Sequence, residues 1–596
     1  MADPRGNPWD YDPGPAKSSG WPELFAATPN YRGLGKAVTG REAFRWHFGP
    51  MFYRGRLDGS ARVLVIGQEG AQDESLAHRS FTGGTGARMQ HLLNHLGVTE
   101  SYLFMNTFVY PIFGQYTATL KGMGQKPVSP IVKHRQSMFD KVANGDLRLV
   151  IAVGEAAKES VATWIASHGG TANPAKLHLA SCGGALAGVR FIGVLHPGGI
   201  TGGGGAAIKA DFIRAVGQIR TWVNADSSWL PADPGATRDL SQAFVYASDP
   251  IPYRDFPFGT CPRLGRGATS SNRGDNQRSI QLFSAQGKYT GTGASLTYSY
   301  NGTGTKDGYA DESGDIPVEP PRHSPRNFDP GPSATYAKLL MGGQSGLGWP
   351  DFAALGVTSS ASFGTGAIYR GRFSSLSLVI LADPDSPDDL FTGRALCGEA
   401  GQRLQAWLTA AGLTRRYLIL RTLPVDVSDL TSAKRSSLVD DPRVRALHTE
   451  ILSRVRSANS GLAALVTLGP GAQRLAANVA PAGLRVLSLN AWSTSARSQW
   501  QSVLDTLSGL SYTKDLSGPS FTMPSVRGRI PTADLPNGTP IWVGTSGDRA
   551  SRPKDNHTGK PSPDYLKLYL PGWTDALTPP PLSAADAAVV PVLKGT

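Results

Sequence analysis

The sequence predicts an α/β protein that contains two copies of an α/β/α domain with a parallel central sheet, together with irregular or β appendages. Two observations carry this prediction. Short apolar runs alternate with segments of helical period, a pattern typical of a parallel sheet covered by helices on both faces. The same pattern then returns later in the chain at a nearly constant spacing of 315 residues.

The apolar runs give the strands of the first copy, at 63–66, 102–105, 148–153 and 190–195. Helical periodicity over 86–96 and 156–167 places helices between them. In parallel sheets of this kind, functional groups gather at the carboxyl ends of the strands. The residues that follow Gly67, Asn106, Gly154 and His196 are therefore the first candidates for a site.

The repeat defines the domain organisation. The run that ends at Gly67 returns at Ala382, and the same offset pairs Gly86 with Gly401 and Tyr102 with Tyr417. The last strand returns at an offset of 295, so a deletion precedes it in the second copy. We predict a catalytic domain at 1–225, a Gly/Pro-rich strand or loop module at 226–325, a second copy at 326–510 and a basic appendage at 511–596.

Composition narrows the function classes. The chain has 596 residues, with 71 glycines and 44 prolines, which suits several folded units joined by irregular stretches. It has no apolar run of the roughly 18 to 20 residues that a membrane helix needs, and its beginning lacks a signal-peptide pattern. We expect a soluble, cytoplasmic protein with no membrane partner. The net charge of +13 favours a polyanionic partner, with DNA as the first candidate.

The cysteines are three and far apart: Cys182, Cys261 and Cys397. This spacing disfavours a zinc ribbon, a disulfide framework and an iron–sulfur cluster with four cysteine ligands. No phosphate-binding Gly-rich motif of the Walker or Rossmann type occurs either. We therefore expect neither a metal nor a cofactor.

Four motifs stand at the predicted strand ends of the first copy. Residues 67–74 read GQEGAQDE, residues 79–83 read RSFTG, Asn106 ends the second strand, and His196 begins HPGGI after the last. In this order they resemble the uracil-DNA glycosylase superfamily, whose members carry G-Q-D-P-Y or G-E-A-P-G-x-D-E, then R-P-F-x-G, a strand-end Asn and a late H-P-S-P-L-S. The resemblance covers most of residues 60–215.

The resemblance implies an enzyme that flips a nucleotide out of DNA and hydrolyses its N-glycosidic bond. Glu69, aligned with the family's Asp, orients water or stabilises the cationic sugar, and Gln68 lends a main-chain contact at the base. His196 donates to the base O2 as negative charge builds there. Glu69 is one methylene longer than that Asp. Asp73 and Glu74 remain alternatives for the catalytic acid. Glu69 could instead have a purely structural role, in which its carboxylate stabilises the N-terminus of a helix.

The same resemblance implies residues for base and DNA binding. Phe81 stacks on the flipped base, and the alternative is an aromatic side chain of the core. Asn106 reads the Watson–Crick edge of the base, and the alternative is a cap at the strand end. Ile200 fills the gap left by the flipped nucleotide. Gly198 and Gly199 let the backbone approach phosphates, unless the loop is merely flexible. Arg79 is a further DNA-binding candidate.

Substrate preference follows from a departure at the base pocket. Where the family has a Tyr that excludes 5-methyl groups, this chain has Gly70 and Ala71. The open wall predicts a 5-substituted pyrimidine as substrate. By analogy with anti-phage glycosylases of this superfamily, that base could be glucosylated hydroxymethylcytosine. Repair of uracil or other deaminated bases, or a noncatalytic DNA-binding scaffold, are the alternatives.

The second copy lacks the reacting groups. Pro384, Leu396, Arg421 and Ala491 stand opposite Glu69, Phe81, Asn106 and His196, and Asp383 is the nearby acid. We therefore expect the second copy to be degenerate and noncatalytic, and to bind DNA or support the first copy.

Overall fold

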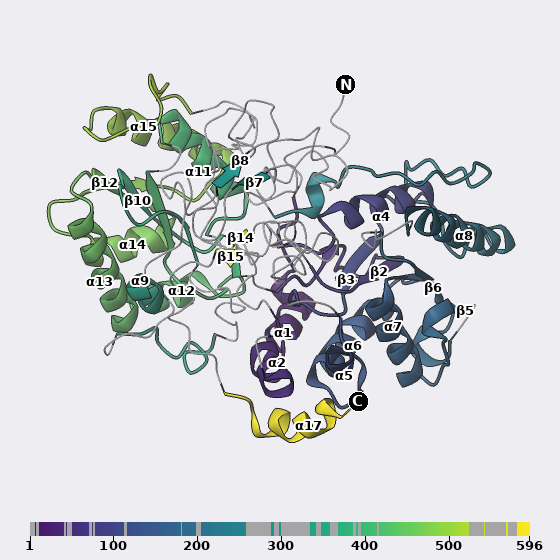
Figure 1. Cartoon of the computed structure of the whole chain (residues 1–596). Coiled ribbons are helices and arrows are strands. Elements are labelled where there is room, and N and C mark those ends of the chain that lie inside the picture. The colour runs from purple at the N-terminus through teal and green to yellow at the C-terminus, as the bar shows by residue number, and fades with distance from the viewer. Residues whose placement is uncertain are drawn as a thin grey trace.

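The computed structural model describes residues 6, 11–40, 43–44, 50–70, 74, 78–112, 116–179, 182–197, 204–257, 288–290, 297–299, 334–340, 347–357, 368–385, 389–390, 395–413, 416–523, 541–542, 568–569 and 581–595. Within them the protein is a mixed α/β structure built on two mostly parallel sheets, as the sequence predicts (Figure 1).

The first sheet has six strands in the order β1-β3-β2-β4-β6-β5. The strands are β1 (Arg54–Gly55), β2 (Val63–Gly67), β3 (Tyr102–Asn106), β4 (Leu149–Val153), β5 (His178–Leu179) and β6 (Arg190–Val194). The four central strands run parallel and coincide with the four apolar runs, which confirms those predictions. The two-residue strands β1 and β5 pair antiparallel at the edges.

Helices cover both faces of this sheet. One face packs on α4 (Gly84–His95) and α8 (Gly204–Ala225) through a core that includes Val65, Phe104 and Phe212. The other packs on α5 (Ala118–Gln125), α6 (Pro130–Ala143) and α7 (Glu155–Ser167). The helices predicted at 86–96 and 156–167 are confirmed as α4 and α7. The unit also includes α1 (Trp21–Ala26), α2 (Tyr31–Thr39), η1 (Lys17–Ser19), η3 (Pro174–Lys176) and η4 (Gly184–Leu186).

The second sheet has five strands in the order β13-β12-β10-β11-β9. They are β9 (Tyr369–Gly371), β10 (Leu378–Ala382), β11 (Tyr417–Arg421), β12 (Ala464–Leu468) and β13 (Arg485–Leu489). Read from β9, the order and directions match β1-β3-β2-β4-β6 of the first sheet. Three strand pairs keep the offset of 315 residues, and β6 and β13 keep 295.

The helices around the second sheet follow the same plan. They are α9 (Ala334–Leu340), α11 (Glu399–Ala410), α12 (Ser432–Val439), α13 (Pro442–Ala458), α14 (Pro470–Val479), η9 (Thr494–Ala496) and α15 (Arg497–Ser508). The core on one face combines strand residues with α13 and α14, and the other face packs on α11 and α15. The first unit divides its faces in the same way, with α6 and α7 on one face of the sheet and α4 and α8 on the other.

The turn before α4 in the first unit is repeated in detail before α11 in the second. Phe81 and Leu396 both adopt positive φ, 57° and 61°. A Cβ on Gly86 would lie 1.6 Å from the Phe81 carbonyl oxygen, and one on Gly401 would lie 1.9 Å from that of Leu396. Only glycine fits at either position, because the carbonyl of the turn lies directly against the helix.

The segment 226–257, which the sequence assigns to the module between the copies, packs on the first unit. The Asp233 carboxylate accepts backbone hydrogen bonds from Glu100 (2.6 Å) and Ser101 (3.0 Å). Asp255, within η5 (Tyr253–Asp255), pairs with the buried Arg54 and accepts the Tyr102 hydroxyl at 2.7 Å. Beyond it, the described residues of the module form an antiparallel pair, β7 (Lys288–Thr290) and β8 (Thr297–Ser299).

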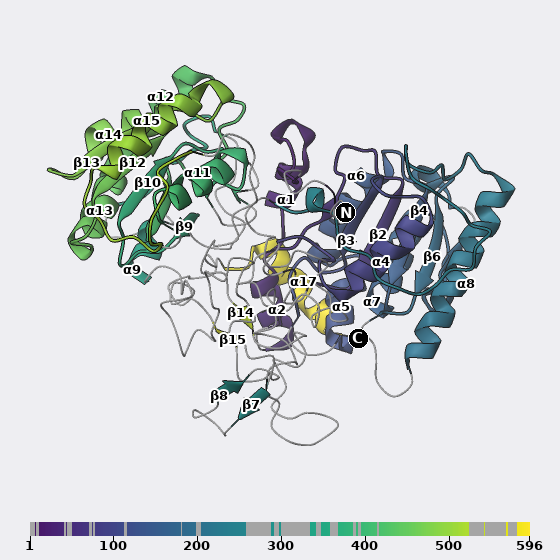
Figure 2. The same ribbon diagram turned by 90° about the horizontal axis from the view of Figure 1, so that it is seen from above.

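The C-terminal segment returns to the first unit. Helix α17 (Ala584–Lys594) packs against α2 and α5, and Figure 2 shows it between them. Leu593 is fully buried there, and its carbonyl lies so close to Gly122 of α5 that a Cβ on that glycine would be 2.5 Å away. The Lys126 ammonium donates to the Val592 carbonyl at 2.8 Å. The appendage also contributes the strand pair β14 (Ile541–Trp542) and β15 (Leu568–Tyr569).

Two contacts connect the N-terminal segment to the second unit. The Tyr11 hydroxyl accepts a hydrogen bond from the Glu399 backbone at 3.0 Å, and Lys17 pairs with Asp429 at 2.7 Å. Among the helices of the described residues, none is both long and apolar enough to cross a bilayer.

Candidate functional site

The carboxyl edge of the first sheet brings the ends of β2 and β3 together. Gly67 and Asn106 are direct neighbours in the parallel register. The pairing continues past both strands, because Thr107 and Phe108 donate backbone hydrogen bonds to the carbonyls of Gly67 (2.8 Å) and Gln68 (2.9 Å). The main chain of Gln68 is therefore held firmly beside the end of β3.

Phe81 and Asn106 converge over Gly67. A Cβ on Gly67 would lie 2.5 Å from the Phe81 ring and 2.6 Å from the Asn106 Oδ1. Phe81 is buried and tilts against Phe104 at a centroid distance of 5.0 Å. The ring thus contributes to the core while its tip reaches the strand end where the amide lies.

Asn106 is buried at the end of β3, and its amide nitrogen lies 3.4 Å from the Ser80 hydroxyl. That hydroxyl donates to the Met51 carbonyl at 2.9 Å, so Ser80 is itself fixed. A Cβ added to Gly70 would lie only 2.1 Å from the Met51 sulfur. The thioether of Met51 therefore occupies the space that a side chain at position 70 would need.

The two glutamates after β2 differ in role. Glu69 is half-buried and is the second residue after the end of β2. Glu74 is buried, and its Oε1 accepts the backbone N–H groups of Thr82 (2.9 Å) and Gly83 (3.2 Å). In the second unit Asp389, 315 residues later, accepts from Leu396 (3.0 Å) and Cys397 (2.8 Å) in the same way. Glu74 therefore fixes the turn that carries Phe81. Asp73, the other alternative acid, lies outside the described residues.

His196 follows β6 on the same edge. Its Cβ lies 3.3 Å from the position that a Cβ would take on Gly154, which directly follows β4 and has a φ of 89°. His196 is an exposed residue, and the protein atoms near its ring still reduce the hydration of the imidazole. This desolvation, and secondly the Arg88 guanidinium, lower the pKa of His196 to about 4. The imidazole is therefore neutral at pH 7.

The strand order sets the spacing of these groups. β3, β2, β4 and β6 are consecutive in the sheet, and neighbouring strands lie about 4.8 Å apart. Asn106 and His196 therefore begin about 14 Å apart at the backbone, with Glu69 between them. A small planar group placed over the edge would have the amide on one side and the imidazole on the other.

Arg79 lies inside the fold. Its guanidinium pairs with Asp12 at 2.9 Å, donates to the His78 carbonyl at 3.0 Å and covers the Tyr53 ring at 4.8 Å. The side chain is only 1% exposed, so its charge is committed to holding the N-terminal segment. Ala71, Gly198, Gly199 and Ile200 lie outside the described residues.

Arg88 is a neighbour of His196 that the motifs did not indicate. This arginine on α4 influences the imidazole and lies 5.7 Å from the centroid of the Tyr246 ring. Tyr246 belongs to the segment 226–257, which the sequence separates from the first copy. No motif connects Tyr246 with Arg88, so the sequence could not have revealed this contact.

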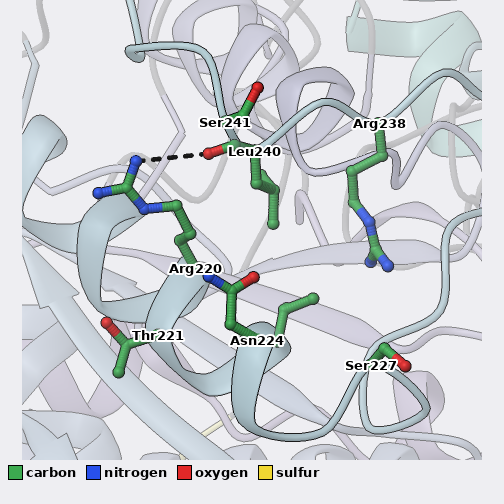
Figure 3. Close-up of a pocket in the computed structure, with 8 residues that line it drawn as sticks. Arg220, Thr221, Asn224, Ser227, Arg238, Leu240 and Ser241 are labelled. Atoms are coloured by element: carbon green, nitrogen blue, oxygen red, sulfur yellow. Dashed lines mark hydrogen bonds between the residues drawn. The ribbon is translucent and has the colours of Figure 1, made fainter.

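A hollow of about 790 Å³ lies at the far end of α8 (Figure 3). Arg220, Thr221 and Asn224 border it from the helix, and Arg238 and Ser241 border it from the chain that follows. Arg220 donates to the Leu240 carbonyl at 3.4 Å. The hollow borders the C-terminal turns of α8, a helix about 33 Å long that follows β6, and it shares no lining residue with the strand edge, so the two are distinct.

The second sheet has a cavity of about 330 Å³ at the corresponding edge. Its lining includes Pro384, Leu396, Gly469 and Ala491, which stand opposite Glu69, Phe81, Gly154 and His196. The edge that the motifs single out in the first unit is thus the edge at which the second unit is hollow.

No protein-family model matches this sequence, and a search of curated proteins found no significant match. Among the residues that the structure describes, no group of three or more His, Cys, Asp or Glu side chains is arranged to hold a metal ion.

Proposed function

We propose that the protein is a DNA glycosylase that hydrolyses the N-glycosidic bond of a 5-substituted pyrimidine and leaves an abasic site. The observation that carries the proposal is the convergence of Phe81 and Asn106 over Gly67, with Glu69 adjacent and His196 on the same edge. The four groups occur in the chain order of the uracil-DNA glycosylase superfamily.

We also infer that the two units arose by tandem duplication of one such domain. The matched strand orders, the constant offset and the repeated turn at Phe81 and Leu396 support this origin. In the second unit Arg421 occupies the position of Asn106, donates to the Val425 carbonyl and lies 3.7 Å from the buried Asp389. This arginine is part of the core, so the second unit keeps the scaffold without the amide.

The chemistry assigns one role to each group. Departure of the base leaves a cationic sugar, which the Glu69 carboxylate stabilises while it orients the attacking water. The leaving base becomes anionic, and the neutral His196 imidazole stabilises that charge by donating an N–H hydrogen bond. The proton that the attacking water loses passes to the Glu69 carboxylate. The Asn106 amide offers a donor and an acceptor in one plane to the base edge, and Phe81 contributes a ring face or edge.

The substrate preference rests on the region after β2. The Met51 thioether occupies the space beside Gly70, so the preference depends on Ala71 alone. By the resemblance, Ala71 stands where the family has its tyrosine, and an alanine there accepts a 5-substituent that a tyrosine would exclude. We propose hypermodified cytosine in phage DNA, such as glucosylated hydroxymethylcytosine, as the biological target of a defence activity.

The test is an excision assay on DNAs that contain uracil, hydroxymethylcytosine or glucosylated hydroxymethylcytosine, with abasic sites detected by alkaline cleavage. We expect excision of a 5-substituted base. Glu69→Gln and His196→Ala should each lower the rate about 100-fold or more while DNA binding persists, because each group acts on developing charge.

Glu100→Gln and His178→Ala are matched controls, since Glu100 is exposed at the opposite edge of the sheet, before β3, and His178 is exposed on the lateral strand β5. Wild-type rates in Glu69→Gln and His196→Ala would show that the site is misassigned. Excision of uracil alone would favour a repair enzyme, and DNA binding without excision of any base would favour a scaffold.

A further inference from the structure

The cavity of the second unit is built by the loops that follow four strands. Asp383 and Asp385 come after β10, Thr422 after β11, Gly469 after β12 and Trp492 after β13. Strand-end crevices of this kind are where open α/β sheets hold ligands. The volume of about 330 Å³ lies at the small end of known ligand sites and suits one ring system.

Most of the cavity wall is apolar. Leu396, Leu423, Val427 and Leu468 line it and are buried. The Trp492 indole is held from two sides, by an edge contact with Trp500 at 5.1 Å and by the Arg403 guanidinium at 4.8 Å. A rigid apolar wall beside an aromatic ring suits a flat ligand.

Asp383 is a fixed acceptor in the cavity wall. Its carboxylate accepts the Gly471 N–H at 2.8 Å and the Thr422 hydroxyl at 3.3 Å, at the start of α14. Added Cβ atoms on Gly469 and Gly471 would lie 2.6 and 2.5 Å from its oxygens. Both positions therefore need glycine to leave room for the carboxylate.

Asp385 is the acceptor that remains available. It lines the cavity and is accessible to solvent, and no residue that the structure describes donates a hydrogen bond to it. Arg435 is the cation among the lining residues, and it donates to the carbonyls of Leu430 (2.9 Å) and Ser428 (3.0 Å). The cavity thus has two carboxyl groups, Asp383 and Asp385, and one guanidinium that already donates to backbone carbonyls. This balance favours a ligand that has N–H donors and carries no negative charge.

We propose that this cavity binds a planar heteroaromatic amine or amidine, the chemical class of cytosine and adenine, with its N–H groups toward Asp385. The proposal is independent of the glycosylase activity, because the second unit offers Pro384 and Ala491 where the first has Glu69 and His196. It gives the second unit a binding role in place of a catalytic one.

The first test is isothermal titration calorimetry of the full chain with benzamidine, adenine and cytosine, against benzoate and thymine. We expect the amine-bearing probes to bind and benzoate, which has the same size and opposite charge, not to bind. Asp385→Asn should weaken binding of benzamidine at least tenfold, since a charge-assisted hydrogen bond is lost. Asp505→Asn, an exposed carboxyl on α15, is the matched control and should bind as the wild type.

A second variant keeps the test decisive if Asp385→Asn does not fold. Ala491 lines the cavity and is exposed, so Ala491→Trp should fill the cavity, abolish binding and leave the circular-dichroism spectrum unchanged. Equal affinity for benzamidine and benzoate, or full binding by folded Ala491→Trp, would overturn the proposal. If a cytosine-containing single strand displaces benzamidine from the cavity and its abasic counterpart does not, the ligand is a base in DNA. If only free bases displace benzamidine, the ligand is a free heterocycle.

Discussion

Two ionisable residues at the two sheet edges are driven toward their neutral forms. Desolvation lowers the pKa of His196 to about 4, with a further contribution from Arg88. Desolvation also raises the pKa of Asp385 to about 7, and the nearby Asp389 carboxyl adds to the rise. The imidazole is thus ready to donate without being a cation, whereas the carboxyl changes charge near neutrality.

Asp385 should make the stability of the second unit depend on pH. Its pKa is higher in the folded state than in the unfolded chain, so ionisation is penalised only in the folded protein. The penalty grows as the pH rises from about 4 to about 7 and is constant above that. We expect Asp385→Asn to melt higher than wild type at pH 8 and to lose most of that advantage at pH 4.

The measurement is a thermal melt of both proteins across this pH range, with Asp505→Asn as the control that should show no pH-dependent gain. A constant difference between Asp385→Asn and wild type at every pH would contradict the assignment. A substitution that stabilises the fold and weakens ligand binding is the pattern expected of a functional residue.

At the residue scale, sequence could indicate positions but not partners. Glu69, Asn106 and His196 were predicted because each lies at or shortly after a predicted strand end, within motifs that resemble one family, and the structure brings these strand ends to one edge. Glu74 could not be distinguished from Glu69, because its role depends on backbone N–H groups eight residues away. The buried pairing of Arg79 depends on Asp12, 67 residues earlier, and no spacing rule connects the two.

At the element scale, the turn that carries Phe81 depends on a glycine. A methyl group at position 86 would meet the Phe81 carbonyl at 1.6 Å, and the helix and the turn cannot both keep their places. We expect Gly86→Ala to destabilise the first unit by at least about 2 kcal/mol, and Gly401→Ala to do the same to the second.

Urea denaturation followed by circular dichroism measures both effects. Gly217→Ala is the matched control, because this glycine lies inside α8 with nothing within 4 Å of an added Cβ. There the higher helix propensity of alanine should stabilise the helix by up to about 1 kcal/mol. Equal stabilities of Gly86→Ala and Gly217→Ala would show that the close contact does not exist.

Helices and strands could be predicted where one sequence pattern, apolar runs or helical periodicity, is strong. The central strands are continuous apolar runs because both sheet faces are covered, and such runs are visible in sequence. The edge strands β1 and β5 are two residues long and leave no periodic pattern. α8 begins in a glycine-rich run of low helix propensity, and its apolar residues Ile208, Phe212 and Ile219 stabilise it by packing on the sheet.

At the scale of the whole molecule, net charge should govern DNA affinity. A chain of +13 must displace counterions when it neutralises phosphates. If it contacts about six phosphates, affinity should fall about 10³-fold between 50 and 200 mM salt. Fluorescence anisotropy with a labelled duplex measures this dependence, and a flat response would indicate a partner other than nucleic acid.

The contact of α17 with the first unit should contribute measurably to stability. Leu593 is fully buried between α2 and α5, so Leu593→Ala should cost about 2 to 5 kcal/mol in the unfolding of that unit. Val592, its neighbour, is 52% exposed, and Val592→Ala should change stability by no more than about 0.5 kcal/mol. Denaturant titrations that gave the two variants the same midpoint would mean that α17 is not docked.

The position of α17 also has a consequence for how the chain is made. The bond between Lys126 and Val592 joins residues 466 apart, with the whole second sheet between them. At a synthesis rate of about 5 to 20 residues per second, the surface of α2 and α5 waits roughly 20 to 90 s for its cover. During that interval the surface that Leu593 later covers stays uncovered, and this is the stage at which aggregation competes with folding.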